Sequence, residues 1–75
     1  MITANQLGWL IKVVGEDYMA DTIFSSPTMA MRFLVAVEAD NLVYSLELHD
    51  LTSFPTAQIG ELVVKKQGSG FEIVL

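Results

Sequence analysis

The clearest periodic pattern in the chain lies at residues 25–41. Ser26 is a favourable N-cap, and Pro27 then takes the first helical position, where a missing N–H has no cost. Asn41 is a suitable left-handed end. We therefore expect a helix, although a strand over Met31–Glu38 is the alternative, because this run is short and contains β-branched valines. The apolar residues of the expected helix share one stripe: Ala30, Phe33, Leu34 and Val37.

Two apolar stretches before this helix favour a β-hairpin. Residues 9–14 are rich in Trp, Ile and Val, which suit a pleated surface, and residues 18–24 form the returning strand. A turn at Gly15-Glu16-Asp17 places Trp9 opposite Phe24, Lys12 opposite Asp21 and Leu10 opposite Ile23. The alternative is a helix capped by Thr3, because Leu7, Leu10, Ile11 and Val14 also lie at helical spacing.

Three further strands are expected after the helix. Residues 42–48 alternate, with Tyr44, Leu46 and Leu48 on one side and Ser45, Glu47 and His49 on the other, which predicts a half-buried strand. A loop over 50–57 follows, in which Phe54-Pro55 should lie against the domain. Residues 59–66 and 71–75 then flank a Gln67-Gly68-Ser69-Gly70 turn, with Lys65 facing Glu72. The expected inner face of this hairpin is Leu62, Val64, Ile73 and Leu75.

Together these elements predict a small α+β fold in the order β-β-α-β-β-β. The sheet should be mostly antiparallel, with one helix packed on one face. The length of 75 residues fits a single domain, with residues 1–8 as a loose arm or a short helical turn. Hydrophobic residues make up 52% of the chain and charged residues 17%, below the usual ~25%. We therefore expect apolar surface to remain for a partner.

No residue pattern points to catalysis. Glu16, Asp17 and Asp21 lie near one turn, but a metal or acid–base site needs several oxygens at one point. His49 lies between Glu47 and Asp50 as a relay would, yet no nucleophile is apparent beside it. The glycines after Lys65 and Lys66 fit a hairpin turn better than a phosphate loop. We expect a non-enzymatic protein without cofactor or metal.

The outer face of the sheet, opposite the helix, is the expected interface. It mixes apolar and charged side chains, as protein interfaces do. The apolar members are Leu10, Val14, Met19, Ile23, Val63 and Val74, and the charged or titratable ones are Lys12, Asp21, Glu47, His49, Lys65 and Glu72. The partner-binding residues predicted from this face and its first turn are Leu10, Glu16, Asp17, Met19, Asp21, Ile23, Glu47, His49 and Asp50.

Charge limits the kind of partner. The net charge is −5, all of it in residues 1–50, so direct binding to nucleic acid is not expected and a protein with a basic surface fits better. The chain lacks cysteine and a membrane-length apolar run, which suits a cytoplasmic protein. Small acidic proteins of phages and mobile elements that block host enzymes offer an analogy of size and charge. The alternative is a structural subunit that self-associates, as a homodimer, through the outer face or a sheet edge.

Overall fold

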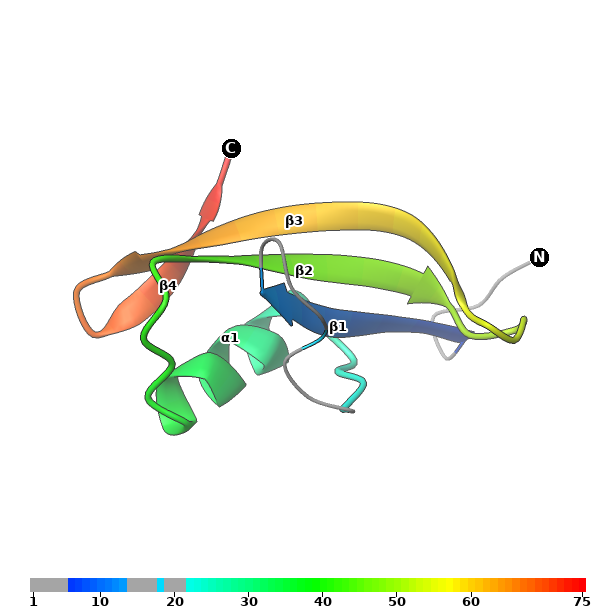
Figure 1. Ribbon diagram of the computed structural model, residues 1–75, viewed down its shortest axis with the longest axis horizontal. Helices are drawn as coiled ribbons and strands as arrows, with labels where there is room; N and C mark the ends of the chain where they lie inside the picture. The colour runs from blue at the N-terminus through cyan, green and yellow to red at the C-terminus, as the bar shows by residue number, and fades with distance from the viewer. Residues whose placement is uncertain (1–5, 14–17, 19–21) are drawn as a thin grey trace.

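The computed structural model describes residues 6–13, 18 and 22–75. In this part of the chain, four strands and one helix form a small antiparallel α+β fold (Figure 1). The fold class is the predicted one, but the described order is β-α-β-β-β and not β-β-α-β-β-β. The strands lie in the sheet in the order β1-β2-β3-β4, and α1 lies below the sheet in the view of Figure 1. The elements are β1 (Leu7–Val13), α1 (Pro27–Ala36), β2 (Val43–Asp50), β3 (Ala57–Gln67) and β4 (Gly70–Val74).

The helix begins where the sequence predicts. Ser26 has an extended backbone, and its Oγ accepts a hydrogen bond from the Met29 amide at 3.2 Å, while Pro27 is the first helical residue. The alternative strand over Met31–Glu38 is therefore wrong. The helix contributes Ala30 and Leu34 to the core, and the sheet contributes the remaining core side chains: Ile11, Tyr44, Leu46 and Val64, with Ala39 from the segment after the helix.

The helix ends earlier than the predicted stop at Asn41. The Ala39 amide donates to the Leu34 carbonyl at 2.9 Å, and the Glu38 amide donates to the Val35 carbonyl at 3.1 Å. These two bonds form a Schellman motif, in which Glu38 takes the left-handed position with φ 54°. Glycine usually occupies this position, because a Cβ there is crowded by the backbone. A carboxylate at a helix C-terminus also faces the negative end of the helix dipole.

We expect Glu38→Gly to stabilise the fold by about 1 kcal/mol, because it relieves the left-handed strain and removes the unfavourable charge. Thermal and urea unfolding measure the change. The variant Glu38→Gln separates the two causes, since it removes the charge and keeps the Cβ. A Glu38→Gly protein that is less stable than the wild type would contradict the assignment of the helix end.

The predicted strand over residues 18–24 does not form at its described positions. Trp9 and Phe24 form an isolated antiparallel bridge through two hydrogen bonds of 2.8 Å, which confirms that predicted pair. Lys12, however, lies opposite Tyr18 and not opposite Asp21, which is outside the described residues. The regular neighbour of β1 is β2, with Trp9 beside Leu48. Leu7 and Gly8 belong to β1, so the expected loose arm does not extend to residue 8.

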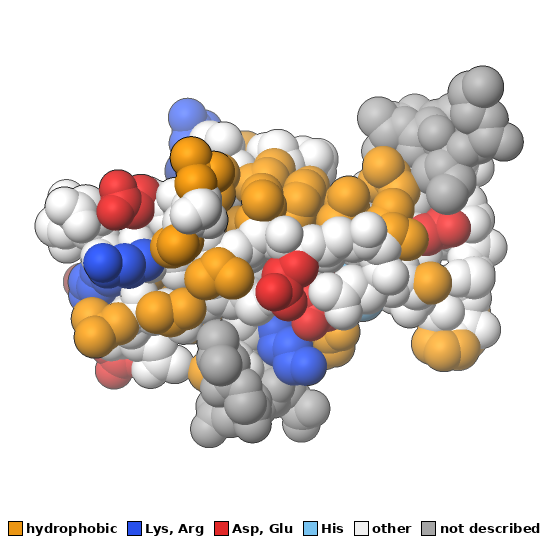
Figure 2. Space-filling view, turned by 90° about the horizontal axis from the view of Figure 1, so that it is seen from above, with side chains coloured by type: hydrophobic (Ala, Val, Ile, Leu, Met, Phe, Trp, Pro, Cys, Tyr) orange, Lys and Arg blue, Asp and Glu red, His pale blue; other side chains and the backbone are white. Residues whose placement is uncertain are grey.

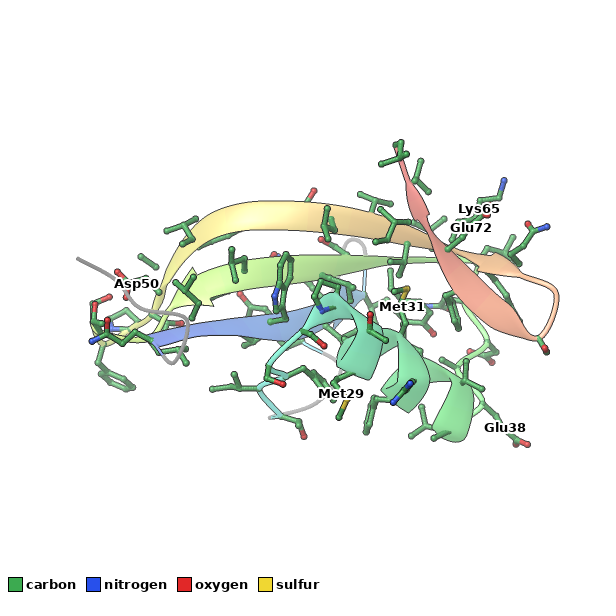
Figure 3. The ribbon with its side chains drawn as sticks, turned by 180° about the vertical axis from the view of Figure 1, so that it is seen from behind. Met29, Met31, Glu38, Asp50, Lys65 and Glu72 are labelled. Atoms are coloured by element: carbon green, nitrogen blue, oxygen red, sulfur yellow. The ribbon has the colours of Figure 1, made fainter. Side chains whose placement is uncertain are left out.

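The C-terminal hairpin follows the predicted register. Val64 pairs with Ile73, Lys65 pairs with Glu72, and the turn lies at Gly68-Ser69, with Gly68 at φ 60°. Figure 3 shows Lys65 and Glu72 together at this end of the sheet and Asp50 at the opposite end. The predicted inner face is wrong at its distal end, because Leu75 lies past β4 and is fully exposed.

The loop before β3 also differs from the prediction. The sequence predicts that Phe54 lies against the domain, but its side chain is 99% exposed. The neighbouring Thr56 takes a contact with the sheet instead, through a hydrogen bond to His49. The loop residue that contacts the sheet is therefore the polar Thr56 and not the apolar Phe54.

Candidate functional site

The centre of the outer face is closed, although the sequence predicts an exposed side for β2. Strand β2 is buried on both faces: Tyr44 and Leu46 face α1, while Ser45, Glu47 and His49 face the other way with exposed fractions of 7%, 4% and 5%. The prediction of a half-buried strand is therefore wrong. Alternation of residue types gave the correct direction of each side chain but not its burial.

The buried polar residues belong to a network centred on Glu47. The Tyr18 hydroxyl donates to Glu47 Oε1 at 2.7 Å, and His49 Nε2 lies 2.9 Å from the same oxygen. His49 Nδ1 lies 2.8 Å from Thr56 Oγ1. The network, which we call the Glu47 network, thus joins β2 to residue 18 and to the loop before β3: its members are Lys12, Tyr18, Glu47, His49 and Thr56.

Lys12 completes the network from β1. Its Nζ lies 3.9 Å from Glu47 Oε2 and 5.8 Å from the centre of the Tyr18 ring. The Tyr18 ring meets the His49 ring edge-on, with centroids 6.0 Å apart. Because the Lys12 side chain is partly exposed, its ion pair is worth little by itself. Its role is to place a positive charge beside a buried carboxylate.

The network holds Glu47 as a carboxylate. Burial by itself raises the pKa of Glu47, but hydrogen bonds from His49 and Tyr18, together with the charge of Lys12, lower this pKa below its ordinary value. The contact between Tyr18 and Glu47 shifts the pKa of Tyr18 in the opposite direction. The hydrogen bond to Glu47, burial and the negative charge of Glu47 raise the pKa of the Tyr18 phenol.

The ionised carboxylate also sets the proton position on His49. A carboxylate accepts hydrogen bonds and donates none, so Nε2 carries a proton. Nδ1 then accepts from the Thr56 hydroxyl when the ring is neutral and donates to it when the ring is charged. Both protonation states of His49 keep both hydrogen bonds, and the network does not require a particular one.

In chemical terms the order Thr56–His49–Glu47 is that of a hydroxyl, a base and an orienting carboxylate. Such a relay needs a substrate carbonyl beside the hydroxyl. The two hollows described below lie elsewhere, between α1 and the β3–β4 hairpin, and Thr56 lines neither. The single carboxylate also accepts a hydrogen bond from Tyr18 and lies near Lys12, so it links residue 18 and β1 to β2 on the outer face.

Gly8 marks a second place where the outer face is covered. Gly8 is buried, and a Cβ added there would overlap Ile23 Cγ2 and lie 3.1 Å from Leu51 Cδ1. Ile23 therefore lies directly over the β1 backbone, although 52% of its own surface is exposed. This contact could not be predicted from the sequence, because a glycine in a strand has several explanations.

We expect Gly8→Ala to destabilise the fold by about 1–3 kcal/mol, because the added methyl group must displace Ile23. Urea unfolding measures the loss. Gly60→Ala is the matched control in the same sheet, since its added Cβ would lie at an ordinary 3.6 Å from Leu48 Cβ. Equal effects of the two substitutions would contradict the packing of Ile23 over Gly8.

The predicted partner-binding residues fall into three groups. Glu16, Asp17, Met19 and Asp21 lie outside the described residues. Glu47 and His49 are on the outer face but are buried within the Glu47 network, which weighs against direct contact with a partner. Leu10 shares this face and is half-buried, Ile23 is exposed, and Asp50 lies at the end of β2.

Hydrogen bonds from the Thr52 hydroxyl and amide lower the pKa of Asp50.

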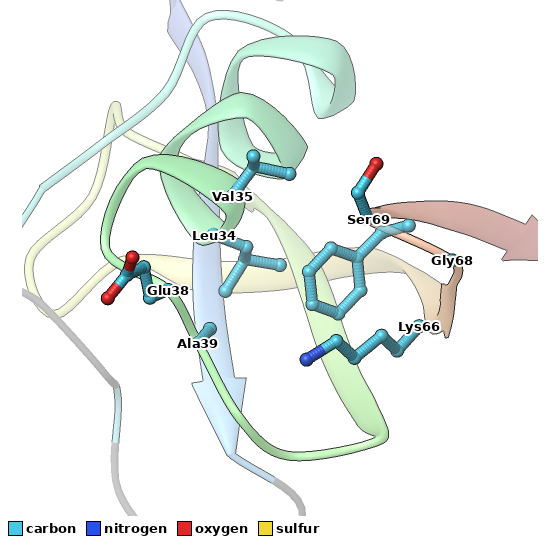
Figure 4. Close-up of a pocket in the computed structure, with 8 residues that line it drawn as sticks. Leu34, Val35, Glu38, Ala39, Lys66, Gly68 and Ser69 are labelled. Atoms are coloured by element: carbon cyan, nitrogen blue, oxygen red, sulfur yellow. The ribbon is translucent and has the colours of Figure 1, made fainter.

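Two hollows lie on the other side of the sheet, between α1 and the β3–β4 hairpin. Their volumes are 310 and 360 Å³, and both are lined by Val35 and Phe71. Figure 4 shows Leu34 and Val35 from α1 facing the hairpin in the first hollow, with Glu38 and Lys66 at its rim. Arg32 lines the second. The charges around the first hollow have both signs and select no ligand class.

Sequence reasoning missed Tyr18 and Thr56 as members of the site. Tyr18 is 29 residues from Glu47, so its contact depends on how the segment before the helix folds back. Thr56 follows Pro55 in a loop where the sequence predicts that Phe54-Pro55, and not Thr56, contacts the domain. A polar run on one side of β2, with one acid and one histidine two residues apart, was the available signal, because buried polar groups need partners.

No family model, no curated protein and no solved structure matches this chain. The described residues contain no helix that is both long and apolar enough to cross a membrane. Within residues 6–13, 18 and 22–75, no three acidic, histidine or cysteine side chains gather as ligands for a metal. The function therefore has to be argued from the geometry of the chain itself.

Proposed function

We propose that this chain is a non-enzymatic protein-binding module that occupies a basic surface of a partner handling nucleic acid, in the manner of small acidic inhibitors of phages and mobile elements. The proposal rests on one observation: apolar side chains are exposed on the face of the sheet opposite α1. Val43 and Val74 are exposed by 39% and 48%, and Val63 lies between their strands. Figure 2 looks onto this face and shows hydrophobic groups separated by charged side chains.

These residues form one patch at the hairpin end of the outer face. In the register of the sheet, Val63 lies beside Val74, and Val43 lies beside Lys65, which faces Glu72. We call Val43, Val63, Lys65, Glu72 and Val74 the hairpin patch. Mixed apolar and charged surfaces of this kind are typical of protein interfaces. The net charge of −5 favours a basic partner by speeding encounter.

Affinity capture from the native host, followed by mass spectrometry, tests the proposal. We expect one abundant partner for the wild type and its loss for Val74→Asp, which places a charge in the hairpin patch. Phe54→Asp is the matched control, because it makes the same charge change at a fully exposed side chain outside the patch. Equal recovery with both variants would reject the hairpin patch, and no recovered partner would reject the proposal.

The electrostatic part has its own test. We expect Glu16→Lys combined with Asp17→Lys to slow association strongly at low salt, because acidic charges steer a basic partner. Stopped-flow measurements with the captured partner give the rate. An association rate equal to that of the wild type would remove the electrostatic part and leave apolar docking.

Self-association is the second candidate, and the exposed edge strand favours it. Strand β4 is the last strand of the sheet, and Ile73 and Val74 on its two faces are both exposed. Unpaired apolar edges are common sites of strand-to-strand pairing. We expect light scattering to show a concentration-dependent dimer that Ile73→Asp removes. A wild-type chain that stays monomeric at high concentration would reject this candidate.

A further inference from the structure

Among the described residues, no strand pairs with the outer edge of the first half of β3. Strand β3 spans Ala57–Gln67, but β4 pairs only with Val63–Gln67. Residues 57–62 therefore have β2 on one side and no described strand on the other, as the length of β3 beyond β4 shows in Figure 1. Ala57, Gln58, Ile59 and Glu61 are exposed along this half.

The backbone at Glu61 faces this open side. The Lys66 amide donates to the Leu42 carbonyl at 2.8 Å, which turns Lys66 toward the β2 side of the strand. Peptide groups alternate in direction along a strand, and the register from Glu61 to Lys65 is unbroken. The amide and carbonyl of Glu61 therefore point away from β2, toward the position that an added strand would take.

Gly60 leaves room for such a strand. A Cβ at Gly60 would meet Leu48 at ordinary distances of 3.6 and 3.7 Å, so packing does not require glycine there. Leu48 remains half-buried beneath the missing side chain. A glycine within a strand often marks the close approach of another backbone. An apolar side chain from an added strand would cover Leu48 at this point.

Charge identifies the added strand. Glu61 lies directly opposite Glu47 across the β2–β3 pair, and its side chain is exposed. Asp50 lies opposite Ala57 at the same end of the sheet, while Lys65 lies at the far end beside Glu72 (Figure 3). A lysine or arginine on the added strand, placed next to Glu61, would form a favourable cross-strand pair with its carboxylate. The occupant that fits is basic.

We propose that the edge formed by residues 57–62 of β3 accepts an extended basic segment of another protein as an added strand. Its basic side chains would lie beside Glu61 on the outer face, and its alternate, apolar side chains would cover Leu48 on the face of α1. This inference rests on the proposed protein-binding function and assigns it a site and a partner chemistry. The register shift between Leu48 and His49 shortens the regular edge, so we expect weak binding.

A labelled peptide of alternating valine and lysine, titrated with the full chain by fluorescence polarisation, is the direct probe. We expect saturable binding, and binding at least ~10-fold weaker for a peptide of alternating valine and glutamate. Glu61→Pro removes the outward amide without breaking the pairing with β2 and should weaken binding at least ~10-fold. Glu61→Ala keeps the amide and should weaken it by about fivefold at most.

Hydrogen exchange keeps the test decisive if Glu61→Pro does not fold. We expect saturating valine–lysine peptide to slow exchange of the Glu61 amide in the wild type. Unchanged exchange, equal binding of the acidic peptide, or full binding to folded Glu61→Pro would overturn the inference. A peptide-free dimer that Glu61→Pro dissociates would make a second copy the occupant and also overturn it. A captured partner retained by Glu61→Pro would leave the proposed function standing without this site.

Discussion

Replacing Glu47 by alanine should destabilise the chain by about 2–4 kcal/mol, because it leaves the buried His49 and the Tyr18 hydroxyl without their shared acceptor. A 75-residue domain has roughly 4–11 kcal/mol of stability in total, so this is a large share. Urea unfolding monitored by circular dichroism measures the change. Glu47→Gln keeps the shape and one acceptor and should lose less.

Ser45→Ala is the matched control on the same face. Ser45 is buried two residues before Glu47, but its Oγ has no hydrogen-bond partner among the described residues. Removing an unsatisfied hydroxyl should leave stability unchanged or raise it by up to about 1 kcal/mol. If Ser45→Ala and Glu47→Ala destabilise the chain equally, the Glu47 network does not hold the outer face.

The same network sets the dependence of stability on pH. The folded chain lowers the pKa of Glu47 below its ordinary 4.5, so the contribution of Glu47 to stability is present above about pH 4.5. It is lost as the pH falls through the lowered pKa. We expect Glu47→Ala to lose less stability than the wild type on acidification below pH 4.5. An equal acid loss in both proteins would contradict this assignment.

Replacing Leu34 by alanine should cost about 2–5 kcal/mol, because Leu34 is completely buried where α1 meets the sheet and its loss leaves a cavity. For a domain of this size, each kcal/mol lowers the melting temperature by about 4–8 °C. Thermal unfolding should therefore show a shift of at least about 8 °C.

Val35→Ala is the matched control for Leu34→Ala in the same helical turn. Val35 is 46% exposed, and alanine is a better helix former, so we expect a loss below about 1 kcal/mol. A Leu34→Ala loss no larger than that of Val35→Ala would mean that α1 does not pack on the sheet through Leu34.

The parts of the fold that could be predicted from the sequence depend on local signals. Ser26 and Pro27 start the helix, and the Gly68-Ser69 turn sets the register of the last hairpin within a few residues. The end of the helix at Glu38 could not be predicted, because its left-handed residue is neither glycine nor asparagine. At Glu38 the backbone hydrogen bonds that end the helix outweigh the low preference of glutamate for a left-handed conformation.

The parts that could not be predicted depend on contacts far apart in sequence. The pairing of β1 with β2 joins Ile11 to Leu46 across the whole helix, whereas the pattern favoured a local hairpin. The candidate site has the same difficulty. Glu47 and His49 were recognised as a polar side of β2, but the acceptor role of Glu47 toward Tyr18 requires knowledge of the folded chain.

A buried, ionised Glu47 links β1, residue 18 and β2 on the outer face of the sheet. Carbon-13 NMR of the Glu47 side-chain carboxyl, followed as the pH is lowered, measures its ionisation directly. We predict a midpoint below the ordinary value of 4.5, with the Tyr18 ring signals changing in the same step. A midpoint at or above 4.5, with Tyr18 unaffected, would contradict the claim.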